Sequence, residues 1–155
     1  MKPSDTIERF QNYVGHDILL SQWKKIDQED VDTHARTTGD EMWLHNDVDR
    51  AVREGPFGGT IVQGFLLLSL FTSFFAEARF PAVPSVKYYL NYGLDHVRFL
   101  RPVLVGSRLR ARAKLSQVRD KGDGRAVIGV DTVLEIEGGG SAPALAAEWL
   151  FLAVA

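Results

Sequence analysis

Cysteine is absent from this chain of 155 residues. The protein therefore has no disulfide framework, no zinc–thiolate site and no thiol nucleophile. It needs no such covalent support, because a domain of this length buries a sizeable core on its own. Hydrophobic residues make up 45% of the chain and charged residues 25%, close to the average for globular proteins. We therefore expect one domain over residues 1–155.

Long uncharged runs are also scarce. The first ten residues, MKPSDTIERF, carry charges where a secretory leader needs an apolar stretch. The longest apolar stretch without a charge, residues 60–76, contains polar side chains and is shorter than the roughly 20 apolar residues that span a membrane. We therefore expect a cytoplasmic protein with no membrane partner, in which this stretch forms a buried helix.

The chain has almost no net charge, −2 at pH 7, but its basic residues are concentrated in one region. Nine of them lie between Arg98 and Arg125, against two acidic residues. In SRLRARAKL, cations alternate with apolar side chains, and this period of two is typical of a strand with one solvated face. An anionic partner is the competing interpretation. No aromatic interleaving or nucleic-acid motif accompanies the cations, so we expect no binding of nucleic acid.

Helix signals flank a short polar segment in the first third of the chain. Asp27 is a good N-cap and Gly39 a good C-terminal stop, so DQEDVDTHARTT predicts a helix that ends at Thr38. Asp47 and Gly55 enclose a second predicted helix, VDRAVRE. The segment between them, GDEMWLHN, is predicted to be a turn that joins the two helices.

The rest of the chain predicts one long helix followed by strands. FLLLSLFTSFFAEA is apolar around nearly its whole circumference, which favours a helix over residues 64–78 that is enclosed by protein. Beyond residue 84 the pattern becomes typical of antiparallel strands with turns such as KGDG and EGGG: VKYYLNYG, DHVRFLRPV, SRLRARAKLSQVRD, GRAVIGVDTVLEIE and PALAAEWLFLAVA. We expect an α+β fold, with an antiparallel sheet wrapped around one central helix. The open edge of such a sheet predicts a homodimer.

The joining segment places Asp40 five residues before His45. On one continuous helix the two side chains would point about 140° apart, but Gly39 is expected to turn the chain before them. They could then converge on one water molecule, and histidine and carboxylate are the usual agents of proton transfer near neutral pH. On spacing alone, a structural cap at Asp40 and a surface histidine at His45 are the favoured explanation of the pair.

No metal or cofactor site is expected from the other polar residues. A set of His45, Asp47 and Asp49 offers one histidine and no cysteine, and Asp47 is already explained as a helix cap. The three other histidines match no catalytic pattern, and we interpret them as surface or packing residues: His16, His34 and His96.

Three blocks of the chain together resemble a known family. TGDEMWLHNDVDRA, GPFGGTIVQGFLLLSLFTS and NYGLDHVRFLRPVLVGSRLRARAKL follow the order and spacing of the MaoC-like (R)-specific enoyl-CoA hydratases, and are most similar to the branch of nodulation protein N. The resemblance covers roughly residues 26–150. It implies a hotdog fold, in which two subunits join their sheets. It also implies reversible hydration of a trans-2-enoyl-CoA thioester to an (R)-3-hydroxyacyl-CoA, in fatty-acyl metabolism.

The resemblance assigns roles to individual residues. The family's Asp and His, five residues apart, correspond to Asp40 and His45, which would hold and deprotonate the attacking water. The glycine that opens the central helix corresponds to Gly64, whose N–H would donate to the thioester oxygen. A small hydroxyl residue two turns further on corresponds to Thr72, with Ser69 nearby. Structural alternatives stay open. Gly64 could serve a tight connection between loop and helix, and the hydroxyls of Thr72 and Ser69 could bond to the preceding helical turn.

The chain departs from the family pattern in two places. The common motif reads G-D-x-N-P-L-H, whereas Glu41, Met42, Trp43 and Leu44 fill its middle here. Gln63 stands where many members have a histidine before the helix glycine. The fold and the proton-transfer pair are therefore expected to persist, while the shape of the loop and the acyl preference differ.

The substrate suggests further contacts and further alternatives. Cations suited to the phosphates of CoA are Arg98, Arg101 and Lys87. Apolar residues suited to the acyl chain are Met42, Phe57 and Phe65, for each of which core packing is an equally good interpretation. Two competing functions remain: a hotdog thioesterase, in which water attacks the carbonyl carbon, and a non-catalytic acyl-CoA binding module.

Overall fold

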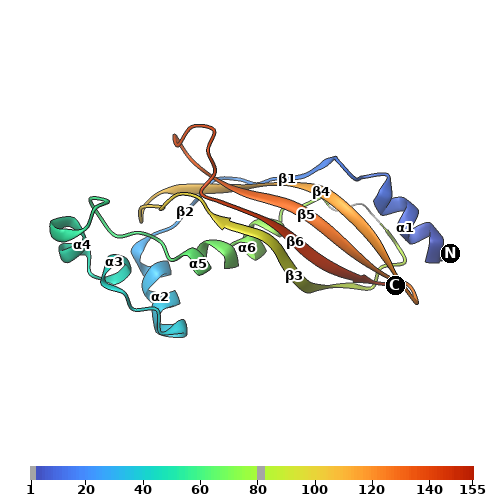
Figure 1. The fold of residues 1–155 in the computed structure, drawn as a ribbon, viewed down its shortest axis with the longest axis horizontal. Helices are drawn as coiled ribbons and strands as arrows, with labels where there is room; N and C mark the ends of the chain where they lie inside the picture. The colour runs from blue at the N-terminus through green and yellow to red at the C-terminus, as the bar shows by residue number, and fades with distance from the viewer. Residues whose placement is uncertain (1–2, 80–82) are drawn as a thin grey trace.

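The computed structural model describes residues 3–79 and 83–155. Its main feature is a curved antiparallel sheet with short helices along one side and at both ends (Figure 1). The helix α1 (Pro3–Gln11) and the C-terminus lie at one end of an elongated molecule (Figure 1). The other end is formed by α2 (Gln28–Thr38), α3 (Trp43–Asn46) and α4 (Val48–Glu54).

The sheet order is β1-β4-β5-β6-β3, and β2 pairs with β4 beside β1. The short strands are β1 (Asp17–Leu20) and β2 (Lys24–Lys25). The long ones are β3 (Tyr88–Phe99), β4 (Arg108–Gly122), β5 (Arg125–Ile136) and β6 (Leu145–Val154). Every pairing is antiparallel, which confirms the expected α+β architecture. Two expected strands, VKYYLNYG and DHVRFLRPV, are in fact the single strand β3, because the chain stays extended and paired with β6 through Gly93.

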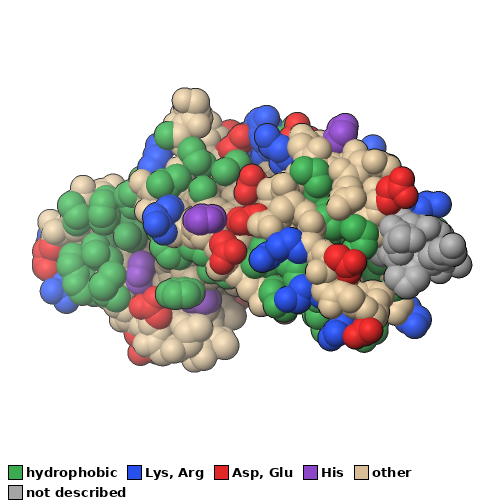
Figure 2. Space-filling view, turned by 45° about the vertical axis from the view of Figure 1, so that its right-hand side comes forward, with side chains coloured by type: hydrophobic (Ala, Val, Ile, Leu, Met, Phe, Trp, Pro, Cys, Tyr) green, Lys and Arg blue, Asp and Glu red, His purple; other side chains and the backbone are tan. Residues whose placement is uncertain are grey.

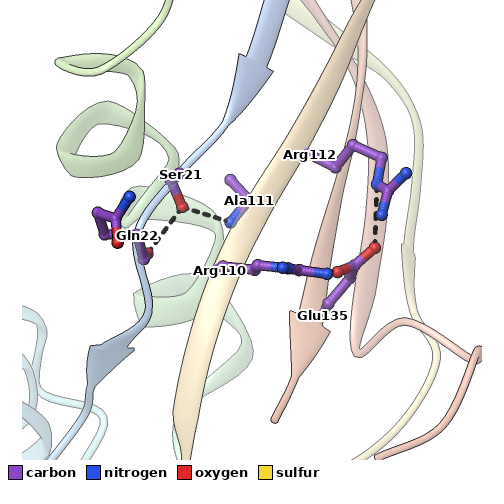
Figure 3. A network of polar contacts seen from close by, with 6 residues as sticks. All are labelled: Ser21, Gln22, Arg110, Ala111, Arg112 and Glu135. Carbon is purple, nitrogen blue, oxygen red and sulfur yellow. Dashed lines mark hydrogen bonds and ion pairs between the residues drawn. The ribbon is translucent and has the colours of Figure 1, made fainter. Parts of the chain in front are cut away.

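One face of β4 is buried and the other carries cations, as the alternating sequence predicts. Leu109, Ala111 and Leu115 are each 0% exposed to solvent. On the outer face, Arg110 and Arg112 both pair with Glu135 on β5, at 2.6 and 3.1 Å (Figure 3). Figure 3 also shows how β4 is tied to the segment after β1, because the Ala111 N–H donates to Ser21 Oγ.

The central helix differs from the expected continuous helix over 64–78. It consists of α5 (Gly64–Ser69) and α6 (Phe71–Phe75), separated by a turn at Leu70. The hydroxyls of Ser69 and Thr72 donate to carbonyls three residues earlier, at Leu66 and Ser69, and such bonds compete with regular helix geometry. Beyond Phe75 the chain continues in tight turns to Ala78.

The apolar helix is enclosed on one side only. Its buried residues, Leu66, Leu67, Phe71 and Phe74, join the core beneath the sheet, whereas Phe65 is 69% exposed. The expectation of a fully surrounded helix was therefore wrong for Phe65. No helix in the described ranges is both long and apolar enough to cross a membrane.

The two short helices around the polar segment have their expected caps. The Asp27 N–H donates to the Asp30 carboxylate at the start of α2, and Gly39 ends α2 with φ of 78°. Asp47 Oδ1 accepts from the Arg50 N–H at the start of α4. The joining segment is more regular than expected, because residues 43–46 form the one-turn helix α3.

Candidate active site

His45 is held in one orientation within α3. Its side chain is 7% exposed, and Nδ1 lies 2.6 Å from the backbone oxygen of Ile61. A carbonyl oxygen can only accept, so Nδ1 carries the proton and donates. In the neutral ring Nε2 is then the acceptor, which is the form of histidine required of a general base.

His45 and Gly64 line the same pocket, which we call the histidine pocket. Its volume is about 230 Å³, and its lining residues are His45, Ile61, Val62, Gly64, Leu67, Phe99, Leu100, Arg101, Pro102 and Val103. The structure thereby brings His45 and the first helical residue of α5 to one small cavity. The sequence predicted both residues but gave no direct sign that the segment FLRPV would form the opposite wall.

The amide of Gly64 is available to a ligand by its position. It is the first residue of α5, and the first N–H groups of a helix have no partner within the helix. A Cβ at this position would lie 3.1 Å from two ring carbons of Phe99. Any larger residue would therefore need the Phe99 ring to shift by a few tenths of an ångström.

Asp40 lies apart from the histidine pocket. It is exposed in the turn after Gly39, and its N–H donates to Thr38 Oγ1 at 3.4 Å. Within the described part of the chain, no hydrogen bond links its side chain to His45. A carboxylate just beyond the C-terminus of α2 is electrostatically unfavourable for that helix, so capping gives no reason for an acid here.

Ser69 and Thr72 line a different depression, which we call the helix groove. Its volume is about 570 Å³, and it is lined by Phe65, Leu68, Ser69, Phe71, Thr72, Asn91, Tyr92, Gly93, Leu94 and Trp149. Both hydroxyls donate within the central helix, as the structural alternative anticipated. The structure therefore brings His45 and Gly64 together and leaves the two hydroxyls in the neighbouring groove.

An aromatic pair lies between the two depressions. Phe65 lines the helix groove, Phe99 lines the histidine pocket, and their ring centroids are 6.1 Å apart. Phe65 is thus the one acyl candidate that lines a described groove with Ser69 and Thr72. Met42 and Phe57 are exposed near the end formed by α3 and α4, where Figure 2 shows hydrophobic side chains gathered.

The three cations considered for CoA cannot act as one cluster. Lys87 and Arg98 are at opposite ends of β3, roughly 35 Å apart at the rise of an extended strand. Arg101 alone lines the histidine pocket, and its Nη1 donates to the carbonyls of Gly139 and Ala142 at 2.6 and 3.0 Å. Its visible contacts therefore hold the loop between β5 and β6 against the pocket wall.

The remaining histidines are at the surface, as expected. His16 and His96 are exposed and His34 is half-buried. Among the described residues no group of three or more histidine, aspartate and glutamate side chains is arranged to hold a metal ion.

Comparison with known proteins gives the family. The sequence profile of the MaoC like domain matches residues 9–137. The chain is 40% identical over 148 residues to 3-hydroxyacyl-thioester dehydratase Z of Mycobacterium tuberculosis, covering 96% of this chain and 95% of the relative. It is 39% identical over 140 residues to nodulation protein N of Rhizobium leguminosarum, covering 88% and 84%.

Solved structures agree with this assignment. The monoamine oxidase regulatory protein of Archaeoglobus fulgidus superimposes with a TM-score of 0.76 at 28% identity, over 92% of this chain and 91% of that one. The (R)-hydratase of A. caviae has a TM-score of 0.66 at 24% identity, over 85% and 94%. The fold is therefore the hotdog fold. The chain belongs to the MaoC-like dehydratase family, and so to the dehydratases and hydratases among the lyases.

Proposed function

We propose that this enzyme reversibly hydrates a trans-2-enoyl-CoA thioester to the (R)-3-hydroxyacyl-CoA. The observation that carries the proposal is His45, whose Nδ1 donates to Ile61 and whose Nε2 is thereby left as an acceptor in a pocket shared with Gly64. The relative at 40% identity is named a 3-hydroxyacyl-thioester dehydratase, which is the reverse direction of the same reaction.

The reaction needs a base for water and a donor for the thioester oxygen. Water adds through its oxygen to the β-carbon as His45 Nε2 takes one of its protons. Negative charge then develops on the thioester oxygen, where the Gly64 N–H donates a hydrogen bond. The proton that His45 Nε2 took then passes to the Asp40 carboxylate, which returns it to the α-carbon, so that the addition is complete and both side chains regain their starting forms.

The assignment of Asp40 requires its side chain to turn toward the pocket. Asp40 is exposed and lies five residues before His45, which favours such a rotation of its side chain and short turn. Together the two residues would hold the water, one accepting its proton and the other orienting it.

The acyl chain would lie in the helix groove. This groove has an apolar lining that includes Phe65, Leu94 and Trp149, and it is next to the histidine pocket across the Phe65–Phe99 pair. Ser69 and Thr72 are then wall residues of the acyl site. For the phosphates of CoA, Arg101 is the favoured cation, because it alone of the three lines the histidine pocket.

We further propose that the chain works as one domain in a cytoplasmic homodimer of fatty-acyl metabolism. The support for the dimer is the edge strand β3, which in the described ranges pairs only with β6 and exposes Tyr88, Leu90, Tyr92 and Leu94 by 40–51%. A row of apolar side chains on an unpaired edge favours addition of a second copy.

The function is tested by incubating the purified protein with enoyl-CoA thioesters of increasing acyl length. Loss of the conjugated thioester absorbance with no release of free thiol is the expected result. Release of free CoA would instead indicate a thioesterase. Binding without turnover at any length would indicate a non-catalytic acyl-CoA module, for which the exposed position of Asp40 is the supporting observation.

A further inference from the structure

A closed set of polar side chains lies around the backbone of His45. Gln28 Nε2 donates to Asp32 Oδ1 at 2.9 Å and to the His45 backbone oxygen at 2.7 Å. Thr60 Oγ1 donates to Gln28 Oε1 at 2.7 Å. Asn46, the next residue after His45, donates through Nδ2 to Asp32 Oδ1 at 2.7 Å.

The amide of Gln28 has one allowed orientation. A carboxylate and a carbonyl, which only accept, face its nitrogen, and a hydroxyl faces its oxygen. A flipped amide would direct its oxygen at two acceptors. Both N–H groups and the oxygen of Gln28 are therefore used, and the side chain is fixed at three points.

Gln28 connects the two chain segments that orient the imidazole. One segment carries His45 itself, whose carbonyl Gln28 holds. The other segment contains Ile61, whose carbonyl holds His45 Nδ1 and whose neighbour Thr60 is bonded to Gln28. Thr60 is 5% exposed, so its hydroxyl is protected from water. A shift of either segment would change the direction of Nε2 in the histidine pocket.

Asp32 supports this arrangement from α2. Its Oδ1 accepts from both Gln28 and Asn46. The Oδ1 of Asn46 is buried and has no hydrogen-bond partner in the described part of the chain, so only its Nδ2 contact fixes the side chain. An unpaired buried acceptor is costly, and the contact to Asp32 keeps Asn46 in that position.

We infer that Gln28 is a positioning residue for His45, with Thr60 and Asp32 as its fixed partners. Gln28 does not line the histidine pocket, and it acts through the backbone of His45 and through the segment that holds the ring. The inference rests on the proposed function, because it treats His45 as the base.

The first test compares Gln28→Leu with the wild type in enoyl-CoA hydration. Leucine has a similar volume but no donors or acceptor, so His45 and Thr60 each lose a partner. We expect kcat to fall roughly 10–100-fold, since a misplacement of about 1 Å has effects of this size. KM should stay within about twofold, because no residue that lines the pocket has changed.

Asp32→Asn keeps an acceptor oxygen and should retain most of the activity, whereas Asp32→Leu should not.

A matched control separates positioning from stability. Val31 lies on the same helix and is fully buried, and Val31→Ala weakens the packing of α2 against the core without removing a side-chain hydrogen bond. At a temperature where both variants are folded, Val31→Ala should keep its kcat. The inference is overturned if Gln28→Leu also keeps its kcat. It is overturned as well if Gln28→Leu and Val31→Ala lose kcat equally when their stabilities are the same.

Two further measurements address the network directly. Thr60→Val should lower kcat in the wild type but have little further effect in Gln28→Leu, because both changes break one unit. Nitrogen NMR of the histidine rings should show the Nδ1–H form of His45 in the wild type and a mixture of forms in Gln28→Leu. Unchanged ring signals would contradict positioning by Gln28 without any reference to activity.

His45→Ala distinguishes this inference from the function itself. If His45→Ala retains full hydratase activity, the proposed function is wrong and the role of Gln28 is lost with it. If His45→Ala is inactive while folded Gln28→Leu is fully active, the function stands and only the positioning role is wrong.

Discussion

At the scale of single residues, Gly64 lies in the histidine pocket with little room for a side chain. Gly64→Ala would place a methyl group 3.1 Å from the ring of Phe99 and beside the proposed oxyanion donor. We expect kcat/KM for enoyl-CoA to fall roughly 10–100-fold as the thioester is displaced. In the double variant Gly64→Ala, Phe99→Leu, the smaller side chain at position 99 removes the close contact with the new methyl group. Recovery of activity in it would mean that the glycine serves packing and not substrate approach.

Glu148 on β6 is a buried carboxylate on the outer face of the sheet, 8% exposed. Burial by itself raises the pKa of Glu148, but hydrogen bonds from Gln117 and Ser116 and the charges of His96 and Arg119 outweigh it, so the pKa is lowered. A lowered pKa in the folded state contributes stability above the unfolded pKa, and that contribution is lost as pH falls through the folded value.

Glu148→Gln should therefore destabilise the protein at neutral pH and have a smaller effect in acid. Glutamine keeps the size and one acceptor oxygen but has no charge to stabilise. Urea denaturation of wild type and variant at pH 7 and near pH 3 measures the difference. An equal loss of unfolding free energy at both pH values would mean that the ionised carboxylate of Glu148 does not contribute to stability.

The family resemblance assigned Asp40, His45, Gly64, Ser69 and Thr72 to one site, and the structure brings only His45 and Gly64 of these to the histidine pocket. The surroundings of His45 were not predictable. The acceptor that fixes the imidazole is a backbone oxygen at Ile61, and any residue type can supply that atom. Gln28 and Thr60 are separated from each other by 32 positions, so no local pattern reveals their contact.

At the scale of elements, Gly39 determines where α2 ends and where the turn that carries Asp40 begins. Its φ of 78° is in the left-handed region, which costs other residues about 1–2 kcal/mol. Gly39→Ala should lower the free energy of unfolding by about 1 kcal/mol and displace Asp40. Gly59→Ala is the control, because its new methyl group meets only Leu104 at 3.7 Å. Equal stability of the two variants in thermal denaturation would contradict this account of the α2 terminus.

Caps and periodicity predicted most elements, and the exceptions have physical causes. The residues of α2 and α4 are enclosed by strong local signals, and both helices formed as expected. The central helix was expected to be continuous, but hydroxyl-to-carbonyl bonds at Ser69 and Thr72 accompany a turn within it. Its exposed Phe65 shows that an apolar sequence does not reveal which side of a helix lacks a covering layer.

At the scale of the whole molecule, the exposed edge of β3 predicts self-association. Leu90→Lys places a charge among exposed apolar side chains of the edge strand, where it should oppose pairing with a second copy. We expect a dimer for the wild type and a monomer for the variant in sedimentation at micromolar concentration. Leu20→Lys, an exposed residue on the distant strand β1, is the control and should stay dimeric. A wild-type protein that is a stable monomer would contradict the homodimer.

The sequence alone could not reveal which strand is the edge. β3 is third in the chain but last in the sheet, because it pairs with β6, whose residues follow their partners by 46–66 positions. Such order depends on contacts across the whole molecule, whereas the alternation along a strand depends only on its two faces.

The central claim is that Asp40 and His45 together hold and deprotonate the attacking water. It is tested most directly by kcat for crotonyl-CoA hydration in wild type, Asp40→Asn, His45→Ala and the double variant, with thermal stability and product chirality recorded for each. We predict an (R)-product from the wild type and a 10²–10⁴-fold loss in each single variant. The double variant should be little worse than either, because residues that act as one unit fail together. A folded Asp40→Asn protein with near-normal turnover would contradict the account.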